Sequence, residues 1–308
     1  MSMRTVRLIV VMMALFFVAG RLEAASFVDE AGRAITVVKP FSRIISLYPA
    51  HTENLFSLGL DREIVGVSMH EDYPAAALTR PTFDYRGDAE RLMAARPDLV
   101  LIRPMIERSH PQLVAKLREA GITVVSLQPV TIDETYTYWR QLGMLTGREA
   151  AAEGMVTRCQ KELAAIDRIV AKIPEAKRQR VYFEAIHAKM KTFAPASMAI
   201  FALEKAGGIN VAADAERVRE TNIAAYGKER ILAKAGGIDV FLAQQGPMNK
   251  VEVATIVNEP GFGAIKAVQE GRVMLVDEEL VARPTLRLAE GIRRIGRMLY
   301  PNHFKAGR

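Results

Sequence analysis

The residues of this sequence that could do chemistry are tyrosines, arginines, histidines and one glutamate in short loops at the ends of predicted strands and helices. In the first half they are Tyr48, His51, Tyr73, Tyr85, Arg86 and Arg103, and in the second half Glu184, His187 and Tyr226. Aromatic faces with a few cations suit a large, flat or anionic metal chelate. A tyrosine or histidine could also ligate the iron of a haem. We therefore expect these side chains to line one ligand-binding cleft.

Several of these residues also have a purely structural interpretation. Tyr48 or Tyr73 could pack beneath a loop, and His51 stands next to a predicted helix start, where it could serve as a cap. Arg86 and Arg103 could be solvated or paired with acidic side chains, as surface arginines commonly are. From the residue types alone, both interpretations stay open.

Glu184 and His187 lie three residues apart at the end of a predicted strand. Their side chains would diverge on an extended strand, but they could converge across a turn. With His51 they could supply part of a zinc or manganese site, an alternative in which the ligand is a bare divalent metal. A hydrolase that uses the pair as acid and base is a third alternative. No G-x-S-x-G motif occurs and Cys159 lies on an apolar helix stripe, so we expect binding and no enzymatic activity.

Strands and helices alternate in both halves of the sequence and position these loops. This alternation predicts an α/β fold of two βα lobes with mostly parallel sheets. The predicted strands are 43–47, 64–67, 99–102, 122–127, 180–183, 239–243 and 273–276, after a hairpin at 26–37. The predicted helices are 52–58, 111–120, 132–145, 197–206, 228–234 and a last helix that opens at Pro284. Ligands of such sheets bind at the carboxyl ends of the strands.

One long amphipathic helix is predicted between the two halves, over residues 146–174. Thr146 and Glu149 form the pattern of a capping box, and Pro174 gives the stop. Apolar residues recur every three or four positions, so one face is buried, with Cys159 in the core. At 1.5 Å per residue the helix is roughly 40 Å long and could brace two lobes, 25–145 and 175–308. An ordinary amphipathic helix inside a single domain is the alternative.

Residues 1–24 have the features of a secretory signal peptide. Arg4 and Arg7 precede an apolar run over residues 8–19, and small residues follow at 24–26. No cysteine stands at the cleavage site, so we expect a periplasmic protein without a lipid anchor. The formal net charge of the whole chain is +7. This mild excess lacks a lysine and arginine block, and we expect no nucleic-acid partner.

The order of motifs resembles one known family over residues 41–301. RIISLYPAHTENLFSLGL, VGVSMHEDYP, GDAERLMAARPDLVLI and LREAGITVVSL are similar to the first lobe of the class III periplasmic binding proteins of ABC importers. AGGINVAADA, YGKERILAKAGGIDVFLA and GRVMLVDEEL look like the second lobe. The resemblance implies a binding protein for a ferric siderophore, haem or cobalamin that works with a membrane permease. It also implies no resident cofactor, and we expect a monomer.

The resemblance further implies two docking carboxylates. Members of this family use one acidic residue on each lobe to meet arginines of the permease, and the matching positions are Glu90 and Glu229. Two carboxylates on separate lobes can each accept a bidentate arginine. A glutamate in the first turn of a helix is also favoured by the helix dipole alone. Among the chelates we favour an iron complex, with cobalamin as the alternative.

Overall fold

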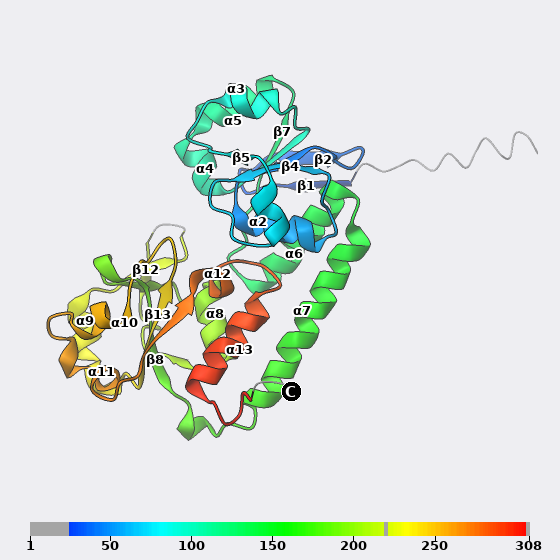
Figure 1. Cartoon of the computed structure of the whole chain (residues 1–308). Helices are drawn as coiled ribbons and strands as arrows, with labels where there is room; N and C mark the ends of the chain where they lie inside the picture. The colour runs from blue at the N-terminus through cyan, green and yellow to red at the C-terminus, as the bar shows by residue number, and fades with distance from the viewer. Residues whose placement is uncertain (1–24, 219–220, 306–308) are drawn as a thin grey trace, which may run out of the picture.

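The computed structural model describes residues 25–218 and 221–305, and the predicted signal peptide lies outside them. Figure 1 shows two α/β lobes, one above the other, with one long helix running along the side of both. The two-lobed α/β prediction is therefore confirmed. None of the helices in this part of the chain combines the length and apolar character that a membrane-spanning segment needs.

The first lobe is built on a five-stranded parallel sheet of order β5-β4-β3-β6-β7. All four residues of β6 are buried, as expected for a sheet covered on both faces. The strands are β3 (Ile44–Ser46), β4 (Ile64–Ser68), β5 (Thr82–Phe83), β6 (Leu99–Ile102) and β7 (Thr123–Ser126). The helices are α2 (Pro49–Ser57), α3 (Ala89–Ala94), α4 (Pro104–Ser109) and α5 (Pro111–Glu119). The predicted hairpin is present as antiparallel β1 (Ala25–Val28) and β2 (Ala34–Val37).

The second lobe has a mixed sheet of order β11-β12-β9-β8-β13-β14. One side of the sheet, β8, β13 and β14, is parallel, and the other side, from β8 through β9 and β12 to β11, is antiparallel. The strands are β8 (Arg180–Ile186), β9 (Lys191–Phe193), β10 (Ile209–Asn210, paired with β8), β11 (Glu216–Arg217), β12 (Ile223–Ala225), β13 (Val240–Gln245) and β14 (Val273–Asp277). The helices are α8 (Met198–Lys205), α9 (Lys228–Ala233), α10 (Val253–Val257), α11 (Lys266–Gln269), α12 (Glu278–Val281) and α13 (Leu288–Leu299).

The long helix α7 covers Glu149–Val170, and the predicted cap at Thr146 is wrong. Thr146 is the last residue of α6 (Ile132–Thr146), and its hydroxyl donates back to the Leu142 carbonyl over 2.7 Å. Gly147, with φ of 64°, ends α6 in the left-handed conformation and separates it from α7. The capping box of this region belongs to α6, formed by Thr131 and Glu134.

The last helix also begins later than predicted, at Leu288 and not at Pro284. Pro284 lies in a buried loop whose carbonyl accepts hydrogen bonds from the first lobe. Such tertiary contacts override the local preference of proline for a helix start.

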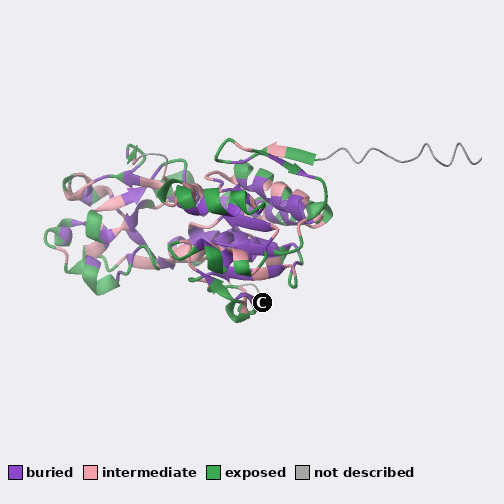
Figure 2. Ribbon diagram, turned by 90° about the horizontal axis from the view of Figure 1, so that it is seen from above, coloured by how far each residue is buried: buried purple, intermediate pink, exposed green. Residues whose placement is uncertain are grey.

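One hydrophobic core continues from the first lobe through α6 and α7 into the second. Trp139 of α6 is fully buried in it, and Cys159 of α7 is 2% exposed, which confirms the prediction that this thiol is core. Figure 2 shows the buried residues concentrated on the sheets and on the inner faces of the helices. The two lobes are therefore joined on the α7 side by apolar packing as well as by the chain.

Candidate functional site

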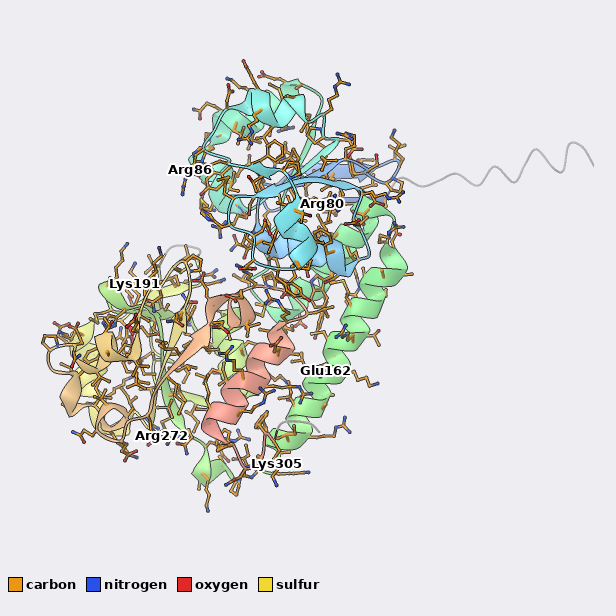
Figure 3. All side chains as sticks on the ribbon, viewed as in Figure 1. Arg80, Arg86, Glu162, Lys191, Arg272 and Lys305 are labelled. Carbon is orange, nitrogen blue, oxygen red and sulfur yellow. The ribbon has the colours of Figure 1, made fainter. Side chains whose placement is uncertain are left out.

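A cavity of about 640 Å³ opens between loops of the two lobes. The first lobe contributes His70, from the loop after β4, and the second lobe contributes the loop after β13. The lining residues are His70, Gln245, Gly246, Pro247, Lys250, Val251 and Glu252. Figure 3 shows Arg86 of the upper lobe and Lys191 of the lower lobe on the edges that face each other. We call the cavity between the two lobes the interlobe cleft.

Tyr48 and Arg103 are brought together because β3 and β6 are neighbouring strands. Tyr48 precedes α2 and Arg103 precedes α4, each directly after its strand. The Arg103 guanidinium lies 4.9 Å from the centre of the Tyr48 ring, within cation–π distance. Burial raises the pKa of Tyr48, and the charge of Arg103 partly opposes that rise.

A second aromatic and cation pair stands on the same lobe. The Arg86 guanidinium lies 5.2 Å from the centre of the Tyr85 ring, and Tyr85 meets His110 edge-on at 5.1 Å. Among the described residues, no carboxylate oxygen lies within 4.0 Å of the guanidinium of Arg86 or Arg103. The first lobe therefore offers two cations that the described carboxylates do not pair.

His51 is placed in the core and does not reach the cleft surface. Its side chain is fully buried, Nε2 lies 2.9 Å from the Ile102 carbonyl oxygen, and Nδ1 lies 2.7 Å from the Tyr138 hydroxyl. Burial lowers the pKa of His51 to about 4, so the ring is neutral near pH 7. His51 packs edge-on beneath Tyr48 at 5.1 Å and supports it. The role of His51 is therefore structural, but it lies inside α2 and does not cap the helix as the sequence suggested.

Tyr226 is also buried, with 6% exposure. It packs in the smaller core of the second lobe, against the Tyr182 ring at 5.7 Å, and its hydroxyl donates to Asp214. Arg230 covers its ring at 4.4 Å. The structure thus does not bring Tyr226 to the cleft surface. Tyr73, by contrast, is 44% exposed in the loop after β4.

Glu184 and His187 do meet, as the sequence suggested they could across a turn. The strand β8 continues through Glu184 to residue 186, and His187 follows in a short 3-10 turn. His187 Nδ1 donates to Glu184 Oε1 over 2.7 Å, and the His187 backbone amide donates to Asn249 Oδ1 over 2.9 Å. His187 Nε2 lies 3.7 Å from Glu259 Oε2, and Glu259 is also paired with Lys228.

This arrangement shifts the pKa values of Glu184 and His187. Burial raises the pKa of Glu184, and the hydrogen bond to Glu184 raises the pKa of His187. The described residues contain no group of three histidine, cysteine or acidic side chains placed to hold a metal ion. Glu184 and His187 therefore form a buried, hydrogen-bonded pair, and Glu259 and Lys228 lie beside it.

Glu278 and Arg283 were not singled out from the sequence, although both follow the carboxyl end of β14. Glu278 Oε2 accepts a hydrogen bond from the Met248 amide over 2.9 Å, at the loop that lines the cavity. Burial raises the pKa of Glu278. Arg283 donates two hydrogen bonds of 2.6 Å to Asp72 of the first lobe. The rule that placed Tyr48 and Arg103 at strand ends applies to these residues too.

The two predicted docking residues stand on separate lobes and are both exposed. Glu90 lies in the first turn of α3, whose N-cap Asp88 accepts from the Glu90 amide. Glu229 lies in the first turn of α9. Neither carboxylate belongs to an ion pair with another described residue. Their role in docking stays a prediction.

Comparisons with known proteins agree with this architecture. A model of the family described as periplasmic binding protein matches residues 44–280. An uncharacterized ABC transporter substrate-binding lipoprotein of Bacillus subtilis is 26% identical over 285 residues, 90% of this chain and 86% of that protein. A cobalamin-binding protein of Halobacterium salinarum is 27% identical over 275 residues, 87% and 72% of the two chains. A solved structure from Staphylococcus epidermidis, described as a possible iron-binding, periplasmic solute-binding protein, has a TM-score of 0.72 and 29% identity, covering 85% of this chain and 100% of that one.

Proposed function

This chain belongs to the periplasmic binding protein family, and on that premise we propose that it captures a metal chelate in the interlobe cleft and delivers it to an ABC importer. The family comprises ABC substrate-binding proteins for iron chelates, haem and cobalamin, which are not enzymes. This member is an extracytoplasmic binding protein. We place it in the periplasm, as a monomer, after removal of residues 1–24.

The observation that supports the proposal is the pair of aromatic and cation contacts on the first lobe, which we propose to face the cleft. Tyr48 with Arg103 and Tyr85 with Arg86 present flat apolar rings beside guanidinium groups that no described carboxylate pairs. A chelate with a large organic ligand can stack on the rings while its oxygen atoms accept hydrogen bonds from the guanidinium groups. Because several relatives are named for cobalamin or vitamin B12, a corrinoid is the first ligand to test, followed by ferric siderophores and haem.

Delivery would use the two exposed carboxylates. Glu90 and Glu229, one on each lobe, are proposed to meet arginines of the permease, while the membrane ATPase supplies the energy of transport. No observation on the described residues favours a site for a bare divalent metal.

The test is a titration of the mature protein with cobalamin, haemin, a panel of ferric siderophores and Zn²⁺. Binding is monitored by the quenching of Trp139 and tyrosine fluorescence. We expect saturable one-to-one binding of one chelate and no saturable response to Zn²⁺. Tyr48→Leu should weaken that binding about tenfold, the scale of one lost aromatic contact. Tyr226→Phe, a change in the buried core of the second lobe, is the matched control and should leave affinity unchanged. A response to Zn²⁺ alone would overturn the proposal.

A further inference from the structure

The loop that joins α12 to α13 belongs to the second lobe by sequence but reaches the first lobe. In Figure 1 it rises beneath α2 and α6 of the upper lobe. We define residues 282–287 of this loop as the interlobe latch. It contacts α2, α6 and the loop after β4, so it connects the lobes in addition to α7.

The centre of the latch is the carbonyl group of Pro284. It accepts one hydrogen bond from Asn54 Nδ2 over 2.9 Å and another from Trp139 Nε1 over 3.2 Å. The donors come from α2 and α6, and all three residues are buried. If the lobes moved apart, these buried donors would lose their partner, which is unfavourable unless water replaces it.

Two arginines of the latch bind acidic residues of the first lobe. Arg287 donates to both carboxylate oxygens of Glu53, over 3.0 and 2.9 Å, and the Glu53 side chain is only 2% exposed. Arg283 makes the same two-pronged contact with Asp72 over 2.6 Å. The Arg287 guanidinium also lies 4.3 Å from the centre of the Tyr73 ring. Bidentate pairs of this kind fix orientation as well as distance.

The latch lies close to charged and aromatic groups at strand ends of both lobes. Arg283 stands close enough to Tyr48 and Glu278 that its charge opposes the rise in the pKa of both, whose main cause is burial. The hydrogen-bonded contact between the lobes therefore lies near Tyr48 of the first lobe and Glu278 of the second. A change in lobe spacing would have to break these contacts.

We propose that residues 282–287 act as a latch that fixes the spacing of the two lobes in the absence of ligand, so that the cleft is preformed. The latch is held on the first lobe by contacts with Glu53, Asn54, Asp72 and Trp139. The inference concerns the protein without ligand and goes beyond the proposed function, because it holds whichever chelate is bound.

The experiment measures the distance between the lobes in the mature chain without added ligand. Spin labels are attached at Lys116→Cys of α5 and Glu270→Cys after α11, both exposed, in a Cys159→Ser background. The latch is broken by Glu53→Gln with Arg287→Met, and separately by Asp72→Asn with Arg283→Met. We expect one narrow distance distribution in the parent and a broader, longer one in each latch variant. Trp139 is the one tryptophan of the chain, so its emission should shift to longer wavelength as water reaches it.

The control removes an ion pair of the same chemistry outside the latch. Arg140 and Glu153 join α6 to α7, with side chains 47% and 57% exposed. Arg140→Met with Glu153→Gln should leave the distance distribution and the Trp139 emission unchanged. If the Glu53 variant does not fold, judged by circular dichroism, the Asp72 variant decides, because the Asp72 side chain is 38% exposed. A folded latch variant with the parent's narrow distribution and emission would overturn the proposal, as would equal broadening in the control.

Discussion

The two lobes arrange the charges near their strand ends differently. On the first lobe Arg86 and Arg103 lie on tyrosine rings, and no described carboxylate pairs them. On the second lobe His187 lies between the carboxylates of Glu184 and Glu259, and Glu259 also binds Lys228. The first lobe thus holds two guanidinium groups without a described carboxylate partner, while the charges around His187 in the second lobe lie against one another.

This difference teaches that clustering of titratable residues does not by itself mark the ligand contacts. Buried acid and base groups that bind each other are costly to separate, so they rigidify a strand end. Cations held on aromatic rings remain free to exchange water for ligand oxygens. We therefore propose that Arg86 and Arg103 contact the ligand from the first lobe, and that the network around His187 supports a strand end of the second lobe.

The largest expected effect concerns the proposed contacts with the permease, to which both lobes contribute equally. Glu90→Ala with Glu229→Ala should abolish uptake of the bound chelate by cells that carry the importer, because both arginine contacts are lost. Chelate affinity of the purified protein should not change, since both residues are exposed and outside the cavity lining. The control is Glu119→Ala with Glu270→Ala, which removes one exposed acid from each lobe. Unchanged uptake in the Glu90 and Glu229 variant would contradict the docking role.

The same comparison shows how far sequence reasoning reached. The strand at 99–102 was predicted to the residue, because a run of four apolar residues between turn signals has few alternatives. Its parallel pairing with β3 follows from the α/β pattern and brings Arg103 to Tyr48. The first strand of the second lobe was predicted to end at 183, whereas β8 continues to Ile186. A glutamate usually indicates the end of a buried strand, and the sequence does not show that Glu184 is hydrogen-bonded to His187.

The remaining errors come from contacts that no local pattern encodes. Thr146 and Glu149 fit the spacing of a capping box, but Gly147 places the helix break between them. The pair of Glu53 and Arg287 joins residues 234 positions apart. Nothing near Pro284 in the sequence indicates that its carbonyl oxygen accepts hydrogen bonds from Asn54 and Trp139. Such long-range polar contacts decide both the start of α13 and the latch.

His51 of the first lobe and His187 of the second are expected to change the stability of the protein with pH in opposite directions. The folded pKa of His51, about 4, lies below the ordinary value of 6.5, so the unfolded chain binds the proton more tightly. Its stabilising effect is complete above pH 6.5 and is lost as the pH falls toward 4, by on the order of 3 kcal/mol. Urea unfolding at a series of pH values measures this. His51→Gln should be less stable at pH 7 but should lose most of that acid dependence; an unchanged slope would show that other groups control it.

A smaller effect on ligand affinity should distinguish Arg86 and Arg103, which no described carboxylate pairs, from Lys228, which is paired with Glu259. Arg103→Met and Arg86→Met should each weaken binding of an anionic chelate such as haemin by about tenfold, the scale of one lost charge-assisted hydrogen bond. Lys228→Met in the second lobe should change the affinity much less, because Lys228 already binds Glu259. Equilibrium titration of the three variants gives the comparison. Equal losses in all three would mean that overall charge, and not the first lobe, attracts the ligand.

The smallest effect is the opposite pH dependence of His187. Its folded pKa is raised above 6.5 by the hydrogen bond to Glu184. Its contribution to stability is therefore complete below pH 6.5 and is lost as the pH rises through the raised folded value. His187→Gln should remove this loss on the alkaline side while leaving the acid-side slope of His51 intact, which urea unfolding between pH 6 and 9 can resolve. Glu184→Gln should flatten the same region, because it removes the carboxylate that holds the proton on His187. If the wild-type protein instead becomes more stable across this range, the network of the second lobe is not held by a charged histidine, and the contrast between the lobes would rest on Arg86 and Arg103 alone.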